Sequence, residues 1–275
     1  MSLDIIYGPI QKDLAEVEAR LKALAGVSYP RLSQLLGHSL GGGGKRVRPA
    51  LVLLSGKFYN YDLASLLPMA VAVEVLHTAT LVHDDAIDHS PLRRGKPTVN
   101  EVWGEDKAIL LGDYLLAQAE ELVSQTENLR VVRLFARAIM TLASGELAQA
   151  FSAFNLEQTR EQYFDRVAAK TASLITLATE SGAILSQAPE KMVTALKNYG
   201  YHLGVAFQIV DDILDFIGDE AEMGKPTGSD LSEGTLTLPA MMVLERYPSD
   251  NPIRTSAARP GSEVTGRTGP LCGGA

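Results

Sequence analysis

The sequence has few of the features that mark a secreted or membrane-spanning protein. It contains one cysteine, Cys272, so it can form neither an internal disulfide nor a cysteine-based zinc site. The first residues lack the basic and apolar segments of a signal peptide, and no run of about 18 apolar residues occurs. We therefore expect a cytoplasmic protein without a transmembrane segment.

Positive charge is also scarce. Lysine and arginine total 25 against 33 aspartates and glutamates, and the formal net charge is −8, which argues against a nucleic-acid partner. Hydrophobic residues make up 46% of the chain and charged residues 21%, the usage of an ordinary globular protein. An anionic ligand would therefore have to be bound by a local group of basic residues.

Proline is absent between Pro97 and Pro189, a stretch rich in strong helix formers. Apolar residues recur there at steps of three and four, and strand-like alternation is rare. The pattern predicts an all-α, single-domain antiparallel helix bundle over residues 1–253, followed by a disordered tail over 254–275, which is rich in Gly, Pro and Ser. The predicted helices cover residues 4–25, 46–58, 63–89, 106–124, 129–153, 158–184 and 190–217.

Two aspartate clusters carry the same spacing, HDDAID at residues 83–88 and VDDILD at 210–215. On a helix, the first and last aspartates of each cluster share a face, and the middle one lies about 100° away. The paired residues are Asp84 with Asp88 and Asp211 with Asp215, flanked by Asp85 and Asp212. A single such cluster is usually a solvated acidic helix end. Two copies on apolar helices instead predict a Mg²⁺ site for a phosphorylated ligand, because a hard cation relieves the carboxylate repulsion.

Basic residues that suit phosphate oxygens occur in four compact groups. They are Lys45, Arg46 and Arg48 in GGGGKRVRP, Arg93 and Arg94 in SPLRRGKP, Lys170 with Thr171, and Lys225 in MGKPTGSD. Alone, each group also fits an ordinary solvated loop or compensation of nearby carboxylates. His77 lies seven residues before Asp84, on nearly the same helical face, where it is either a packed core histidine or part of the site.

The motifs GGKRVRP, HDDAID with RRGKPT, the KT pair, and FQIVDDILD with GKPTGSDL together resemble the trans-isoprenyl (polyprenyl) diphosphate synthases in order and spacing. The match runs from about Leu36 to Leu244. The resemblance implies an all-α isoprenoid synthase bundle with a central cavity, Mg²⁺ as cofactor and a homodimer. It also implies head-to-tail condensation of isopentenyl diphosphate with an allylic diphosphate to a trans-polyprenyl diphosphate, with peripheral release of this product to a membrane.

The resemblance assigns roles to individual residues. The metal ligands are Asp84, Asp88, Asp211 and Asp215, supported by Asp85 and Asp212. The allylic diphosphate is held by Arg93, Lys170 and Lys225, and isopentenyl diphosphate by Lys45, Arg48, His77 and Arg94. Thr171 and Gln208 lie beside the carbocation. The released diphosphate accepts the closing proton, so the reaction needs no side-chain nucleophile.

Product length is predicted by the residues before the first cluster. Family members with short products carry a bulky aromatic about one turn before the aspartates, where this chain has Ala79 and Thr80, with Leu76 one turn deeper. These smaller residues predict an open tunnel and a product longer than C20.

Two features depart from the family pattern. Thr235 stands where many members have lysine, and the chain changes after Asn251 into the Gly- and Pro-rich tail.

A non-catalytic or regulatory subunit of a heteromeric prenyl synthase is the main alternative. A carboxylate-bridged metal bundle would need two ExxH pairs, of which only Glu74 with His77 is present, and a class I terpene cyclase would lack the paired basic loop and the second DDxxD.

Overall fold

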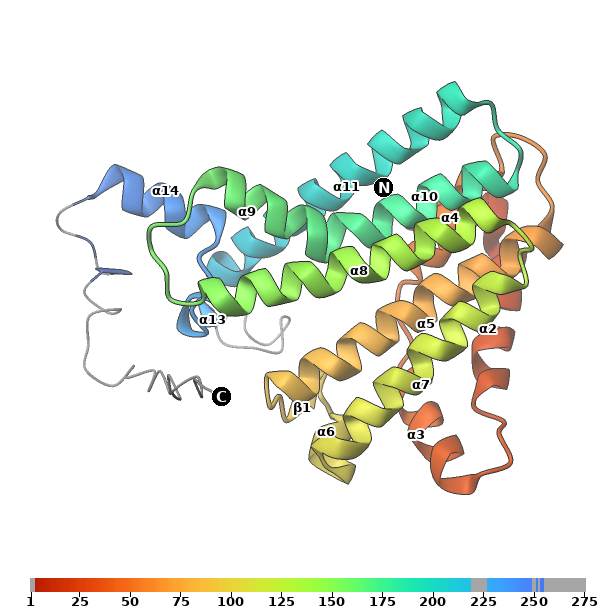
Figure 1. Ribbon diagram of the computed structural model, residues 1–275, viewed down its shortest axis with the longest axis horizontal. Helices are drawn as coiled ribbons and strands as arrows, with labels where there is room; N and C mark the ends of the chain where they lie inside the picture. The colour runs from red at the N-terminus through yellow and green to blue at the C-terminus, as the bar shows by residue number, and fades with distance from the viewer. Residues whose placement is uncertain (1–2, 219–226, 249–250, 252, 255–275) are drawn as a thin grey trace, which may run out of the picture.

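The computed structural model describes residues 3–218, 227–248, 251 and 253–254. Within these ranges the chain is a bundle of helices with one short β-hairpin, which confirms the all-α prediction (Figure 1). The elements are α1 (Leu3–Tyr7), η1 (Gly8–Ile10), α2 (Gln11–Leu24), α3 (Pro30–Leu40), α4 (Val47–Gly56), α5 (Leu63–Ile87), β1 (Leu92–Arg93), β2 (Lys96–Pro97), α6 (Val99–Trp103), α7 (Glu105–Ser124), α8 (Leu129–Ser152), α9 (Arg160–Val167), η2 (Ala168–Ala172), α10 (Ser173–Leu185), α11 (Glu190–Ile217), α13 (Ser229–Ser232) and α14 (Leu238–Arg246). Apart from Arg254, the predicted tail lies outside the described residues.

Helix α5 is the central element of the core. Asp62 starts it by accepting a hydrogen bond from the Ala64 amide, and Asp88 ends it. Its length and hydropathy of 1.6 would suit a membrane span, but 61% of that window is buried inside the protein. A core helix of a globular protein passes the same test, and α5 packs against α4, α7 and α10.

The predicted helix boundaries need several corrections. The helix expected over 4–25 is divided by η1, because Pro9 lacks an amide hydrogen. The helix expected over 158–184 begins at Arg160, after an N-cap by Thr159, and contains the π-helical turn η2. Helices α3, α6, α13 and α14 were not predicted, since they are short or lie between glycine-rich segments whose helicity depends on tertiary packing.

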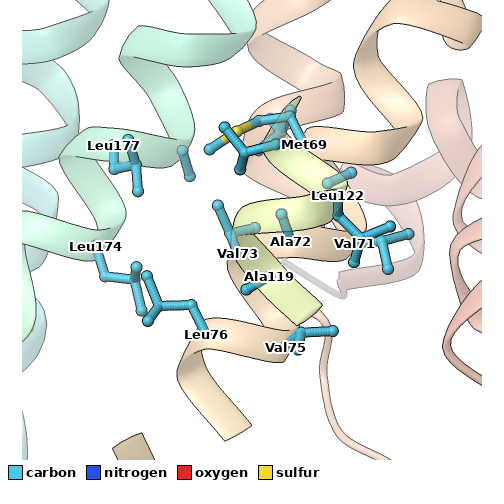
Figure 2. Close-up of a cluster of buried hydrophobic side chains, with 14 of the residues drawn as sticks. Met69, Val71, Ala72, Val73, Val75, Leu76, Ala119, Leu122, Leu174 and Leu177 are labelled. Carbon is cyan, nitrogen blue, oxygen red and sulfur yellow. The ribbon is translucent and has the colours of Figure 1, made fainter. Parts of the chain in front are cut away.

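Two clusters of buried apolar side chains hold the bundle together. The larger one joins α2 through α8 with α10 and the start of α11, and Figure 2 shows part of it, including Val73, Leu76 and Leu174. The smaller one joins α9 to α14 through Tyr163, Leu236 and Met241. In Figure 1 the C-terminal ends of α5, α8 and α11 all lie toward the left of the molecule. Both aspartate clusters are therefore carried at the same end of the bundle.

Candidate active site

The first aspartate cluster occupies the last turn of α5. Asp84 is partly buried, while Asp88 is exposed and caps the helix with its amide bonded to the Asp84 carbonyl over 2.8 Å. Burial raises the pKa of Asp84 to about 6, and the charges of Glu146 and Asp88 also raise it, while Lys170 and Arg93 oppose the shift. Asp84 is thus a carboxyl group whose negative charge the neighbouring cations do not fully offset.

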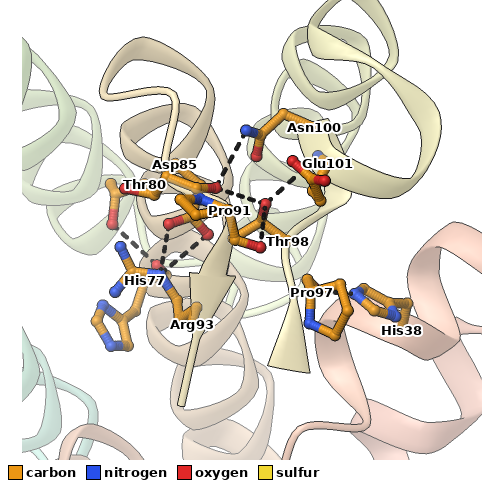
Figure 3. Close-up of polar contacts among 11 residues, drawn as sticks. His38, His77, Thr80, Asp85, Pro91, Arg93, Pro97, Thr98, Asn100 and Glu101 are labelled. Atoms are coloured by element: carbon orange, nitrogen blue, oxygen red, sulfur yellow. Dashed lines mark hydrogen bonds and ion pairs between the residues drawn. The ribbon is translucent and has the colours of Figure 1, made fainter. Parts of the chain in front are cut away.

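Asp85, the middle residue of this cluster, points to a different partner. Arg93 of β1 donates from Nε to both carboxylate oxygens, over 2.8 and 2.9 Å (Figure 3). The hairpin that carries Arg93 is fixed by Thr98, which donates to the Ser90 carbonyl over 2.6 Å, and by a contact of His38 with the Pro97 carbonyl. Arg93 therefore compensates the helix end in this structure, and its role in binding a diphosphate stays a prediction.

The second cluster lies near the end of α11 and is more deeply enclosed. Asp212 is 3% exposed and accepts hydrogen bonds from the Tyr163 hydroxyl over 2.6 Å and from Gln208 Nε2 over 2.9 Å. Asp215 is 1% exposed and accepts from the Ser229 hydroxyl over 2.9 Å. Asp211 is exposed, with Gln208 Nε2 at 3.4 Å. The cluster combines one outward carboxylate with two that neighbouring donors fix in place.

The π-helical turn η2 connects the two clusters. Lys170 lies 3.0 Å from Glu146 Oε1 on α8, and the charges of Asp84 and Asp88 also act on it. Although burial opposes its charge, these carboxylates raise the pKa of Lys170 above the ordinary value. The next residue, Thr171, donates its hydroxyl proton to Gln208 Oε1 on α11. Adjacent residues of one turn therefore face the two aspartate helices.

Two glycines allow η2 to lie between α8 and α11. A Cβ on Gly145 would lie 2.6 Å from Ala169 Cβ, and one on Gly204 would lie 2.4 Å from Ala172 Cα. No side chain fits at either position without moving the π turn. This close approach brings Glu146 to Lys170, and sequence reasoning missed Glu146 because its partner lies 24 positions along the chain.

Basic residues gather around His77 on α5. The pKa of His77 lies well below its ordinary value, first because it is buried and then because Arg48, Arg94 and Arg93 act on it. Arg48 Nε is one of the buried side-chain atoms of the described residues that lack a hydrogen-bond partner. Arg94 donates to the Gly43 carbonyl over 3.5 Å, so the hairpin meets the glycine run. A neutral histidine beside several cations makes this basic group suited to a multiply charged anion.

In the glycine-rich segment, the structure pairs Arg46, a member of the first basic group, with carboxylates of the protein itself. Arg46 adopts a left-handed φ of 48°, and its guanidinium pairs with Glu18 of α2 and with Glu74 of α5, the latter over 2.8 Å. Lys45 is exposed, and its carbonyl accepts the Tyr7 hydroxyl over 2.8 Å. Because Glu74 is engaged with Arg46, the Glu74 to His77 pair does not form a metal-binding ExxH motif.

The residues predicted to set product length lie deep in the core. Leu76 and Ala79 are 0% exposed, and Figure 2 shows Leu76 facing Leu174 of α10. The Thr80 hydroxyl donates to the His77 carbonyl over 2.9 Å. Leu76 and Ala79 are therefore buried and Thr80 is partly buried, and their role in setting product length stays a prediction, as does the open tunnel.

The donor set fits Mg²⁺, because Asp84, Asp88, Asp211 and Asp215 supply only oxygen atoms. Within the described residues, no three His, Cys, Asp or Glu side chains come close enough to hold a metal by themselves. Mg²⁺ commonly uses few carboxylates together with substrate phosphates, so the separation of these carboxylates is compatible with a site completed by substrate.

Lys225 lies outside the described residues. A separate cavity of about 670 Å³ between α8 and α9 is lined by Met140, Gln149 and Arg166, among others, and by none of the predicted site residues.

An all-α bundle with two aspartate-bearing helices and a group of basic residues agrees with the fold of the solved polyprenyl synthases. A family model described as polyprenyl synthetase matches residues 29–264. Heptaprenyl diphosphate synthase component 2 of Geobacillus stearothermophilus is 40% identical over 96% of this chain and 81% of its own length. The crystal structure of heptaprenyl diphosphate synthase from Staphylococcus aureus superimposes with a TM-score of 0.84 at 42% identity, covering 86% of this chain and 76% of that one.

A polyprenyl synthase from Caulobacter crescentus, solved with calcium and isoprenyl diphosphate, has a TM-score of 0.85 at 35% identity, covering 89% of this chain and 75% of that one. The chain belongs to the polyprenyl synthetase family, and it is therefore a prenyltransferase of the polyprenyl diphosphate synthase type.

Proposed function

We propose that this protein condenses isopentenyl diphosphate head-to-tail with an allylic diphosphate, using Mg²⁺, and that its trans-polyprenyl product is longer than C20. The observation that carries the proposal is the basic group around His77 of α5, in which Arg48 of α4 has a buried Nε without a hydrogen-bond partner. His77 lies on the same helix as the first aspartate cluster. Excess positive charge near carboxylates with excess negative charge suits two diphosphates, one bound directly and one bound through metal ions.

The reaction divides between these two regions. Ionisation breaks the C–O bond of the allylic diphosphate, and the electron pair leaves with the diphosphate, near Lys170 and Arg93. When bound, Mg²⁺ supplies charge stabilisation for this leaving group. Arg48 and Arg94 hold the isopentenyl diphosphate so that its double bond attacks the allylic cation. The released diphosphate then accepts the proton that restores a double bond.

The surroundings of the cation have to be dry and able to stabilise positive charge. Thr171 and Gln208 would lie beside this cation, and their mutual hydrogen bond fixes both side chains. The apolar side chains of Ala79 and Leu76 exclude water, which would otherwise capture the cation. Because neither residue is a bulky aromatic, the product can grow past them, beyond C20.

Incubation with labelled isopentenyl diphosphate and allylic primers of several lengths, with and without Mg²⁺, tests the proposal. We expect products longer than C20 that require the metal. Absence of any condensation by the protein alone would favour the second candidate, a subunit of a heteromeric synthase, which the name "component 2" of the Geobacillus relative supports. Activity that appears only after a partner chain is added would establish that candidate.

We also propose that the active form is a cytoplasmic homodimer, whose apolar product can pass to a membrane surface. Met140, Leu147 and Phe151 of α8 are 68%, 59% and 90% exposed, and their spacing places them along one side of the helix. A second copy would cover these side chains. Light scattering of the wild type and of Phe151→Glu tests this assignment, and a monomeric wild type would contradict it.

A further inference from the structure

Glu146 of α8 is a charged side chain for which the reaction outlined above has no role. Its carboxylate lies within 3.0 and 3.2 Å of Lys170 Nζ, through Oε1 and Oε2. The two side chains are 34% and 38% exposed, so the pair is partly shielded from solvent. The ion pair with Glu146 therefore affects how Lys170 can interact with a substrate.

Three carboxylates compete for the Lys170 ammonium, namely Glu146, Asp84 and Asp88. Of these described residues, Glu146 makes the ion pair, whereas Asp84 acts on Lys170 as a nearby charge and makes no hydrogen bond or ion pair with it. Lys170 is therefore held on the α8 side of the site.

The backbone fixes this arrangement. Gly145 lets α8 approach η2 so closely that a Cβ there would lie 2.6 Å from Ala169 Cβ. Glu146 and Lys170 are the residues that follow Gly145 and Ala169, so the close contact of the helices places their side chains together. The pair is thus a consequence of helix packing and is present before any ligand binds.

Without Glu146, the nearest attraction for Lys170 would be the aspartates of α5. An aspartate paired with an ammonium offers a cation less charge and fewer free oxygen lone pairs. We propose that Glu146 is a positioning residue that holds the Lys170 ammonium away from Asp84 and so keeps Asp84 available to a divalent cation. This inference rests on the proposed metal-dependent function of the same site.

Metal binding without turnover tests the proposal. Mn²⁺ is titrated into the full chain with inorganic pyrophosphate, and free Mn²⁺ is read by electron paramagnetic resonance. We expect Glu146→Gln to weaken Mn²⁺ binding roughly two- to fivefold, the range for loss of a partly exposed charge pair. In a Lys170→Ala background, the same substitution should change binding less than twofold, because the competing ammonium is gone.

The matched control is Glu190→Gln at the start of α11, which removes a glutamate paired with Arg130 on the surface and should leave Mn²⁺ binding unchanged. In turnover assays, Glu146→Gln should raise the Mg²⁺ concentration for half-maximal rate while kcat at saturating Mg²⁺ stays within twofold of wild type. A simple structural role would instead lower kcat and the melting temperature.

Unchanged Mn²⁺ binding in Glu146→Gln overturns the proposal, and so does an equal loss in the wild-type and Lys170→Ala backgrounds. If the wild type binds Mn²⁺ with pyrophosphate but condenses no isopentenyl diphosphate, the proposed function fails while the Glu146 test still gives its answer.

Discussion

Tyr163 of α9 donates its hydroxyl proton to Asp212 of α11 over 2.6 Å, and both side chains are buried. The other Asp212 oxygen accepts from Gln208, so both oxygens are engaged within the protein. Burial raises the pKa of Asp212, and these two donors partly offset the shift. Asp212 therefore anchors α11 to α9, and in doing so orients the outward Asp211 one position before it.

Tyr163→Phe leaves a buried carboxylate short of one donor. We expect it to lower the free energy of unfolding by about 1–3 kcal/mol, the usual cost of an unmade buried hydrogen bond to a charged group. Urea denaturation of the metal-free protein measures this change. Tyr199→Phe, at an exposed position on α11, should stay within about 0.5 kcal/mol of wild type. Equal effects of the two substitutions would refute the anchoring role.

The raised pKa of Asp84 predicts a pH-dependent stability. Because the folded protein holds this proton up to about pH 6, while the unfolded chain releases it near 3.8, stability falls as pH rises between these values. Asp84→Asn removes that penalty. Above pH 7, we expect the free energy of unfolding of the variant to exceed that of the metal-free wild type by on the order of 2 kcal/mol.

Urea titrations in EDTA at pH 4 and pH 7.5 measure this difference for Asp84→Asn. The two proteins should be nearly equally stable at pH 4, where the carboxyl group is largely protonated in the folded state. A stability difference of the same size at both pH values would show that Asp84 is not buried as a carboxyl group with raised pKa.

The close contact of Gly204 with Ala172 predicts that α11 tolerates no side chain there. Gly204→Ala should cost about 1–3 kcal/mol through overpacking, and it should lower kcat because η2 carries Lys170 and Thr171. The control is Gly37→Ala in α3, where nothing lies within 4 Å of the added Cβ and helix propensity should add up to about 1 kcal/mol of stability. Thermal unfolding and steady-state rates of both variants measure these effects. A Gly204→Ala variant with wild-type melting temperature and kcat would contradict the close contact of Gly204 with Ala172.

Replacement of Arg48 should weaken the binding of one substrate, isopentenyl diphosphate. Its guanidinium has a buried Nε without a partner, and burial lowers its pKa, so the side chain is ready for an anion. Arg48→Gln should raise KM for isopentenyl diphosphate at least about tenfold, with a much smaller change in KM for the allylic substrate. Equal changes in KM for the two substrates would contradict the assignment of Arg48 to isopentenyl diphosphate.

Ala79→Tyr should shorten the product, because the ring would fill the space one turn below the aspartates. Chromatography of labelled products measures chain length. Since Ala79 is fully buried, the melting temperature has to be followed as well. A folded, active variant with an unchanged product distribution would contradict the position of the tunnel.

Much of the site follows from local spacing. The carboxylates at i and i+4 share a face on any helix, so HDDAID and VDDILD predict that Asp84 acts with Asp88 and Asp211 with Asp215. In the structure Asp211 is exposed, whereas Asp215 is 1% exposed and accepts a hydrogen bond from Ser229, so the joint use of these carboxylates stays a prediction. The end of α5 beside Asp88 also follows from the turn-forming residues after it. These features depend on neighbours within one or two turns.

Long-range contacts required the tertiary structure. The spacing of Asp84, Asp85 and Asp88 along one helix could not reveal that Asp85 pairs with Arg93, or that Asp212 pairs with Tyr163 at a separation of 49 residues. The interruption at η2 was missed because the π turn is stabilised by the close packing of two glycines from other helices, which leaves no periodic signal within residues 168–172 itself.

The amino-acid order alone determined that the chain is helical, that two acidic faces exist, and which residue types accompany them, because helix periodicity and side-chain chemistry are local properties. Packing decided which carboxylates are exposed, that Glu146 and not Asp84 holds Lys170, and that one π turn faces both acidic helices. Burial, and the charge interactions that strengthen with it, arise only when distant segments come together.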